Sequence, residues 1–329
     1  MIRKTFSRIA LILTSFALVF VAIMLILNKQ YVIDQITVWR YSPSDSIKSL
    51  IDRTGMSDYG KFIFYASQPQ LQSSADFNQS CARIEETSSV LGCYDGDKIY
   101  IYDIKNSQLE GIREVTAAHE ALHAVYNRLN DVDKTRINTL LEDEYKKLES
   151  NKNFTDRMSF YARTEPGQRG NELHSIIGTE ISSISTELES YYDKYFSDRQ
   201  QIVDLNAKYI SIFQDLENKA NTLKAQLDSL KISVDNQTNQ YNTDIQILNN
   251  DISEFNSKAN NGLFFSQAEF NYERNIILNR VNILNNMKDK INSDIENYNL
   301  LLVQLNSIAS ESQQLHNSID STLSPVPSI

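Results

Sequence analysis

The second half of the chain carries a long series of apolar side chains that alternate between spacings of four and three residues. Such a seam lets two helices wind around each other and bury one stripe of each. Only 9 glycines and 5 prolines occur in the whole chain, so long helices meet few breaks. The sequence therefore predicts a coiled-coil helix from about Gln201, with this seam: Leu216, Ala220, Leu223, Leu227, Leu230, Val234, Tyr241, Ile245, Leu248, Ile252, Phe255 and Ala259.

The seam stops at Asn260-Asn261-Gly262, and a second helical run begins near Ser266. Ser266 and Glu269 have the spacing of a capping box, which marks a helix start. The second run ends before Pro325 and is about as long as the first. It carries its own apolar seam: Ile276, Ile277, Val281, Leu284, Ile291, Ile295, Tyr298, Leu302 and Leu305. We therefore expect residues 196–322 to form an antiparallel helical hairpin on the order of 85 Å long, followed by a tail over residues 323–329. Such a rod could bind a partner or a second copy of the chain.

An uncharged apolar run extends from Ile9 to Leu27 and would span about 28 Å as a helix, close to the thickness of a bilayer core. Secretory signals have shorter apolar cores that end in a small-residue cleavage site, which this run lacks. More basic residues precede the run than follow it: Arg3, Lys4 and Arg8 against Lys29. The positive-inside rule then predicts a single-pass membrane anchor over residues 1–31, with a cytoplasmic N-terminus and the rest of the chain outside.

The formal net charge is −10, and no block of Lys and Arg interrupts it. Proteins that bind nucleic acid present clustered basic side chains to the phosphates. We therefore expect no nucleic-acid partner for this chain.

Cys81 and Cys93 are the two cysteines of the chain. Both fall in the part expected outside the cytosol, where a disulfide between them can persist. Two buried thiols would explain the same spacing. A structural zinc site of the ribbon type would need paired Cys-x-x-Cys units, which are absent from the sequence.

The segment between the anchor and the hairpin has mixed character. A short helix is expected over 45–53, and the aromatic and β-branched residues of 61–66 favour a strand. Residues 88–94 and 98–103 read as a β-hairpin around the turn Asp95-Gly96-Asp97. Glu110–Leu129 and Val132–Leu148 then show the three- and four-residue spacing of amphipathic helices. The sequence predicts an α+β domain over residues 32–195.

The first of these helices contains His119-Glu120-Ala-Leu-His123. Histidines four apart differ by about 40° around a helix and about 6 Å along it, so both imidazoles reach one ion. Zinc binds neutral imidazole and, in catalytic sites, keeps one position for water. Glu120 can take a proton from that water and pass it to the leaving group. We therefore expect one Zn²⁺ on His119 and His123, with Glu120 as the catalytic base.

A third ligand must come from elsewhere, and the segment 169–180 offers three candidates. Glu172 and Glu180 are about 12 Å apart along the expected helix, and His174 points about 200° away from Glu172, so only one of them can bind the ion. Glu172 is favoured and Glu180 is the alternative. Small residues share the face of Glu172 and allow a close approach to the histidine helix: Ser175, Thr179 and Ser183.

Two further side chains could assist at such a site. His174 could lie behind the ligands and stabilise the transition state, or it could be a core histidine with satisfied hydrogen bonds. Tyr161 could stabilise an oxyanion, although with 17 tyrosines in the chain a packing role explains it as well. His316 falls in the hairpin and is expected to be structural.

The motif His119-Glu120-x-x-His123 followed by Asn171-Glu172-Leu-His-Ser175 resembles the gluzincin-type metallopeptidases, in particular small membrane-associated ones. The resemblance covers roughly residues 44–195. It implies a zincin-like fold, His119, His123 and Glu172 as zinc ligands, and Glu120 as the base. The family pattern often has Asp four residues after the ligand Glu, where this chain has Ile176. The whole layout is also similar to bacterial membrane proteins that carry such a domain before a helical hairpin.

Together these features predict a membrane-anchored, outward-facing zinc metalloendopeptidase that acts on peptides or proteins. The alternative is a cell-surface interaction protein that works through its rod and keeps an idle metal site. A hydrolase of cell-wall peptides is a third hypothesis, because substrate choice depends on cleft loops that the motif does not determine.

Overall fold

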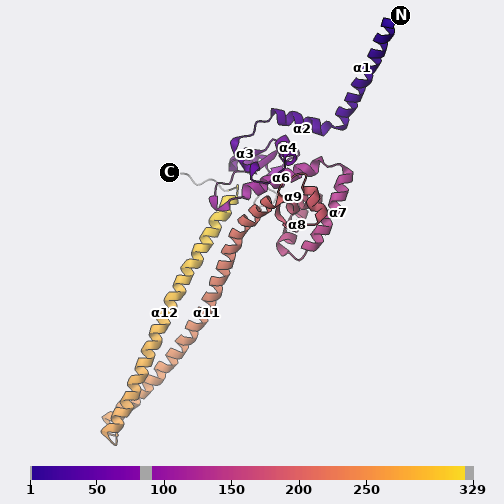
Figure 1. Cartoon of the computed structure of the whole chain (residues 1–329). Coiled ribbons are helices and arrows are strands. Elements are labelled where there is room, and N and C mark those ends of the chain that lie inside the picture. The colour runs from indigo at the N-terminus through magenta and orange to yellow at the C-terminus, as the bar shows by residue number, and fades with distance from the viewer. Residues whose placement is uncertain (1, 82–90, 323–329) are drawn as a thin grey trace, which may run out of the picture. The chain divides into compact units, whose positions relative to one another are not determined.

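The structure is a computed structural model that describes residues 2–81 and 91–322, and side chains from Leu13 onward. The chain begins with α1 (Ile2–Leu27) and α2 (Lys29–Arg40), which meet at a sharp bend (Figure 1). Among the described residues, no helix taken alone has the length and hydropathy of a membrane span. The pair formed by Leu13–Leu27 and α2 has both, but it is bent by 81°.

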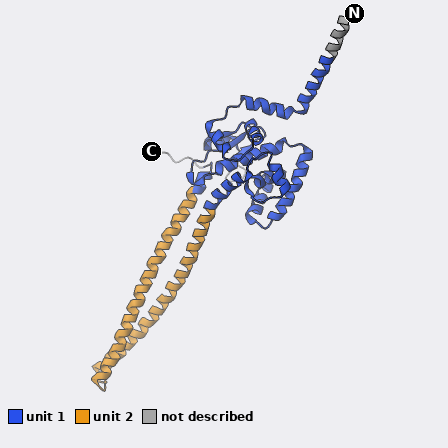
Figure 2. Cartoon of the chain, viewed as in Figure 1, with its two compact units in different colours: residues 1–212, 315–329 blue, residues 213–314 orange. Residues whose placement is uncertain are grey.

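The chain divides into two compact units (Figure 2). The first comprises residues 1–212 and 315–329, and the second comprises residues 213–314. The first unit contains α1 to α10, a small sheet and both ends of the hairpin. The second unit is the rest of the hairpin. The chain is thus mostly helical, with three short strands in the part that the structure describes.

The first unit opens after α2 with α3 (Asp45–Asp52) and α4 (Asp58–Ala66). The short helix expected over 45–53 is confirmed, but the strand expected over 61–66 is wrong, because these residues belong to α4. Ser57 begins that helix by accepting a hydrogen bond from the backbone N–H of Gly60. α4 looks like a strand in sequence because it is apolar on two sides: Ile63 and Phe64 enter the core, whereas the Phe62 ring contacts Tyr31 of α2.

The sheet has three strands in the order β1-β3-β2. The expected hairpin is confirmed as β2 (Gly92–Tyr94) and β3 (Ile99–Tyr102), which pair antiparallel around the Asp-Gly turn. Its predicted first arm begins at residue 88, and residues 88–90 lie outside the described part. β1 (Gln70–Gln72) pairs parallel to β3. It is not predicted from the sequence, because three residues, two of them polar, are too few to show the alternating pattern of a strand. The helix α5 (Ser74–Ser80) and the 3₁₀ turn η1 (Ser107–Leu109) complete this region.

The predicted helices after the sheet are confirmed as α6 (Ile112–Arg128) and α7 (Asp131–Leu148). Three more follow, namely α8 (Lys152–Thr164), α9 (Arg169–Glu180) and α10 (Thr186–Tyr192). α6 is the central helix, since it contacts α3, α4, α9, β2 and β3 and buries most of its side chains. An apolar core around α6 therefore holds its position from several sides.

α9 packs closely on α6 because small residues line the contact. A Cβ on Gly178 would lie 2.4 Å from Cδ1 of Leu122, so only glycine allows this approach. Ser175 and Thr179 are fully buried on the same face, as the sequence predicted. Ser183 does not extend this face, because α9 ends at Glu180 and Ser183 is exposed beyond it.

Two long helices form the hairpin, α11 (Arg199–Asn260) and α12 (Gln267–Ile319). Ser266 caps α12 as expected, accepting a hydrogen bond from the N–H of Glu269. Within the second unit, several predicted seam positions are buried: Leu216, Leu223, Leu227, Leu248, Leu284 and Ile291. Ile276 and Ile295, also assigned to the seam, are 43% and 41% exposed. Next to the turn, the rings of Phe255, Phe264 and Phe270 pack together.

Candidate metal centre

The two histidines of the motif lie side by side on α6. Their ring centroids are 4.7 Å apart, and their planes are nearly perpendicular. One donor atom of each of His119, Glu120 and His123 lies within 4.8 Å of the others, which is the spacing of a group that can hold a metal ion. Burial lowers the pKa of both imidazoles, that of His123 to about 4. Both rings are therefore neutral, as metal ligands must be.

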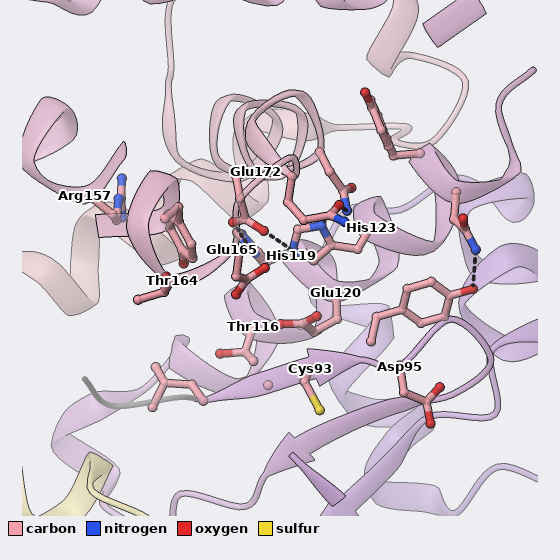
Figure 3. Close-up of a pocket in the computed structure, with 18 of the residues that line it drawn as sticks. Cys93, Asp95, Thr116, His119, Glu120, His123, Arg157, Thr164, Glu165 and Glu172 are labelled. Carbon is pink, nitrogen blue, oxygen red and sulfur yellow. Dashed lines mark hydrogen bonds and ion pairs between the residues drawn. The ribbon is translucent and has the colours of Figure 1, made fainter. Parts of the chain in front are cut away.

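Glu172, in the first turn of α9, brings a carboxylate to both histidines (Figure 3). Its Oε1 lies 3.4 Å from Nε2 of His123, and its Oε2 lies 3.8 Å from Nε2 of His119. Ligand atoms on a tetrahedral zinc, each about 2.0 to 2.1 Å from the metal, are separated by about 3.4 Å. Each histidine nitrogen thus lies at nearly the spacing of two zinc ligands from an oxygen of the Glu172 carboxylate.

The ring of His123 is held by its other nitrogen. Nδ1 donates a hydrogen bond to Oδ1 of Asn171 at 2.9 Å, and Oγ of Ser175 lies 3.1 Å from the same nitrogen. The amide of Asn171 is itself oriented, since its Nδ2 donates to Oε1 of Gln168. With the proton on Nδ1, the lone pair of Nε2 points toward Glu172 and is available to a metal.

The carboxylate of Glu172 is buried, and one of its oxygens lacks a hydrogen-bond partner among the described residues. The side chain is 3% exposed, and Oε2 has no hydrogen-bond donor among the described residues. Burial raises the pKa of Glu172 to about 8, with Glu165 adding to the shift. A buried carboxylate of this kind is costly unless a cation compensates it. Two neutral imidazoles and an unpaired carboxylate oxygen fit a divalent cation such as Zn²⁺.

Glu120 follows the first histidine and is nearly fully buried. Burial raises the pKa of its carboxyl well above the usual range, and the nearby charges of Glu172 and Glu165 act in the same direction. On one side Glu120 packs against β2. A Cβ on Gly92 would lie 2.9 Å from Oε1 of Glu120 and 2.5 Å from Cγ2 of Thr116. The strand can approach α6 this closely only because residue 92 has no side chain.

The candidate metal ligands face a cavity of about 920 Å³. β2 and the turn after it form one wall, from Leu91 to Gly96, and α8 with its following turn forms another, from Arg157 to Gln168. Figure 3 shows Glu165 of that turn beside His119 and Glu172, and β2 passing on the side of Glu120. Tyr209, near the start of α11, also lines the cavity. The cavity is large enough to admit several residues of a peptide.

The other candidate ligand, Glu180, is engaged elsewhere. Its carboxylate forms a 2.6 Å ion pair with Arg157 of α8, at the edge of the same cavity. Glu180 and Glu172 are at opposite ends of α9. The structure brings Glu172, and not Glu180, to the histidines.

Tyr161 lines the cavity from α8, and burial followed by the charge of Glu172 raises the pKa of its phenol. It therefore remains protonated and able to donate a hydrogen bond at neutral pH. His174 lies away from the cavity, fully buried among tyrosine rings, with Nε2 at 2.8 Å from the hydroxyl of Tyr191. His174 is thus a core histidine of α9 that does not line the cavity.

The two cysteines are joined by a disulfide, with 5.9 Å between their Cα atoms. Cys81 ends α5 and is buried, whereas Cys93 lies on β2 and lines the cavity. The disulfide therefore ties α5 to the strand that lies against Glu120.

Sequence reasoning did not find Asn171, Gly92 or Glu165 as members of this site. Asn171 directly precedes Glu172 and carries a signal in hindsight, because metal-bound histidines commonly donate their second N–H to such an oxygen. Gly92 and Glu165 reach the site only through the packing of β2 and α8 on α6. No family model, curated protein or solved structure matches the chain.

Proposed function

We propose that this protein is a membrane-anchored zinc metalloendopeptidase of the gluzincin type, with its catalytic domain outside the cytoplasm. The observation that supports the proposal is the distance from the carboxylate oxygens of Glu172 to Nε2 of His119 and His123, 3.8 and 3.4 Å. These three side chains come from two helices, and nothing but the fold brings them together. The proposed membrane location and orientation rest on the apolar run of α1 and on the basic residues that precede it.

The chain's own residues suit hydrolysis of a peptide bond. Zinc bound by the three ligands would supply Lewis acidity to a water molecule and to the scissile carbonyl. Glu120 is proposed as the base that accepts a proton from this water, and the burial that raises its pKa favours return of that proton to the leaving amine. The phenol of Tyr161, protonated in the same cavity, can donate a hydrogen bond to an oxyanion.

The walls of the cavity favour an extended peptide as substrate. β2 is at the end of the strand order and, within the described residues, pairs only with β3. This edge would offer backbone groups to a peptide laid alongside, which is the common mode of strand addition. Because β2 lines the cavity and touches Glu120, a peptide on this edge would pass the candidate metal position.

The Glu120→Gln variant tests the proposal on the full chain in detergent or lipid nanodiscs. We expect wild type to bind about one zinc per chain and to cleave an unstructured protein such as casein. Glu120→Gln should keep the zinc and lose cleavage by about a hundredfold or more. Glu149→Gln, an exposed glutamate after α7, is the matched control and should behave as wild type. Equal cleavage by Glu120→Gln and wild type would refute the assigned mechanism.

A second candidate function is partner binding through the hairpin. Apolar side chains are unusually exposed on the second unit, with Phe265 95%, Val303 66% and Leu300 60% exposed. Such side chains commonly mark interaction surfaces. Replacing residues 213–314 by a short linker separates the two functions: a protein that works only through its rod would lose its cellular role, whereas Glu120→Gln would leave that role intact.

A further inference from the structure

α2 exposes an apolar face on the side opposite to the one it packs on the first unit. Its inward side is fixed by Asp34, whose carboxylate is 6% exposed and accepts two hydrogen bonds from Arg128 of α6, both at 2.9 Å. At 100° per residue, Val32, Ile36 and Trp39 lie about 140 to 160° around the helix from Asp34. Trp39 is 85% exposed and Ile36 45% exposed.

Neighbours of this face complete an amphipathic pattern. Ile33 is 44% exposed beside it, and both ends of α2 are basic, with Lys29 at the start and Arg40 at the end. Exposed apolar and aromatic side chains flanked by Lys and Arg are typical of helices that lie in a membrane interface. Tryptophan in particular prefers the headgroup level, where its ring is half solvated.

The geometry of the chain before α2 points to the same surface. A single residue, Asn28, separates α1 from α2, and the two helices meet at 81°. A helix that crosses a bilayer along its normal would leave the next helix almost in the plane of the membrane. The apolar face of α2 would then be adjacent to the end of the span.

We propose that α2 is an interfacial helix: Val32, Ile33, Ile36 and Trp39 insert into the outer leaflet, while Asp34 and Arg128 fix the catalytic helix to its other side. This inference rests on the membrane anchoring proposed above. Arg128 is five residues after His123 and nine after His119, or about 7 and 14 Å along α6. The site is therefore held close to the bilayer, and its substrates are peptide segments that adjoin a membrane anchor.

The single tryptophan of the chain makes the first part directly measurable. The full chain is reconstituted in phosphatidylcholine–phosphatidylglycerol vesicles, with or without bromine on the acyl carbons nearest the headgroups. We expect Trp39 emission to be quenched about twofold or more by the brominated lipid and to be shielded from acrylamide. As a control, Lys152→Trp in a Trp39→Phe background places the probe at an exposed site beyond the far end of α7, where acrylamide alone should quench it.

Each outcome decides a different claim. If the chain floats with vesicles but brominated lipid does not quench Trp39, the interfacial helix is refuted while the anchor stands. If Trp39 is shielded from acrylamide yet not quenched by bromine, a protein surface covers α2 and the inference is again overturned. If the chain does not float at all, both the anchor and the inference fail.

A tethered peptide tests the second part. The same sequence is offered free or attached to vesicle lipid at one end, and cleavage is compared for wild type and Glu120→Gln. We expect wild type to prefer the tethered peptide by about tenfold and to cut near the anchor, since tethering raises the local concentration. Equal cleavage rates on both peptides would overturn the proposal that the substrates adjoin a membrane anchor. Cleavage of neither peptide would count against the proposed peptidase function, and the Trp39 result would then decide on α2 alone.

Discussion

Nδ1 of His123 donates a hydrogen bond to Oδ1 of Asn171, 48 residues further along the chain, and this bond fixes which nitrogen faces Glu172. Asn171→Leu keeps the shape of the side chain but removes the acceptor. We expect zinc affinity to fall about 10- to 100-fold, because the imidazole loses its orientation and its tautomer preference. Competition with a zinc-binding dye measures the change. The exposed Asn153→Leu on α8 is the control and should bind zinc as wild type does.

Glu172 and Glu180 can be separated by their isosteric amides. Glu172→Gln should lose stoichiometric zinc, because the carboxylate that approaches both histidines is neutralised. Glu180→Gln should retain zinc, since that carboxylate is paired with Arg157. Metal content after gel filtration gives the answer. The reverse result, with zinc lost only from the Glu180 variant, would reassign the third ligand.

The close approach of β2 to α6 predicts a steric effect at Gly92. In Gly92→Ala the new Cβ would lie 2.5 Å from Cγ2 of Thr116 and 2.9 Å from Oε1 of Glu120, so the strand or the Glu120 side chain must move. We expect cleavage to fall about tenfold or more, since small displacements of a catalytic group are costly, while zinc remains bound. Adding Thr116→Ser removes the closest methyl group and should restore part of the rate. Failure of that rescue would mean that the strand itself, and not the clash, determines activity.

The ion pair between Asp34 and Arg128 predicts non-additive stability changes. The two side chains are 6% and 13% exposed, so removing one partner leaves a poorly solvated charge. Asp34→Leu or Arg128→Met alone should lower the free energy of unfolding by about 3 to 5 kcal/mol. The double variant should lose less than either single variant. Urea titration of the full chain in detergent, followed by circular dichroism, measures all three, and additive losses would contradict a coupled pair.

Metal removal should destabilise the first unit. A ligand that binds only the folded state at a hundredfold excess over its Kd adds about 2.7 kcal/mol. We therefore expect a chelator to lower the melting temperature of wild type and added zinc to restore it. Glu172→Gln serves as the control and should melt at one temperature with or without zinc. A wild-type melting temperature that ignores chelation would argue against a bound metal.

The helices of this fold are predictable where their period is long, as in α6, α7 and the two arms of the hairpin. The sequence of α4 wrongly predicts a strand because Phe62 and Phe64 both contact apolar neighbours, one on α2 and the other in the core. Burial on two sides removes the amphipathic period that distinguishes a helix from a strand. Ser57 and Asp58 carried the correct signal, since they form the cap and first turn of a helix.

At the candidate site, the residues that share one helix can be predicted from the sequence, whereas the contacts between helices can be predicted only in outline. His119, Glu120 and His123 share one helix, so helical geometry alone relates them. Glu172 was favoured over Glu180 because of the small residues on its face, and the structure buries Ser175 and Thr179 against α6. The ion pair between Glu180 and Arg157 cannot be predicted from the sequence, because Arg157 comes from a separate helix and no sequence pattern shows how that helix packs.

The hairpin leaves the first unit and returns to it, since residues 213–314 are flanked on both sides by segments of that unit. At the outgoing end, Arg199 donates hydrogen bonds to the carbonyls of Ile181 and Ser182, which follow α9. At the returning end, the hydroxyl of Ser321 donates a hydrogen bond to Oδ1 of Asn78. The rod is therefore a cassette inserted into an otherwise continuous domain. Both arms can therefore be shortened by whole heptads, or the sequence between 213 and 314 exchanged, without removing any residue of the first unit. A truncation at residue 201, by contrast, would also remove residues 315–329, which belong to the first unit.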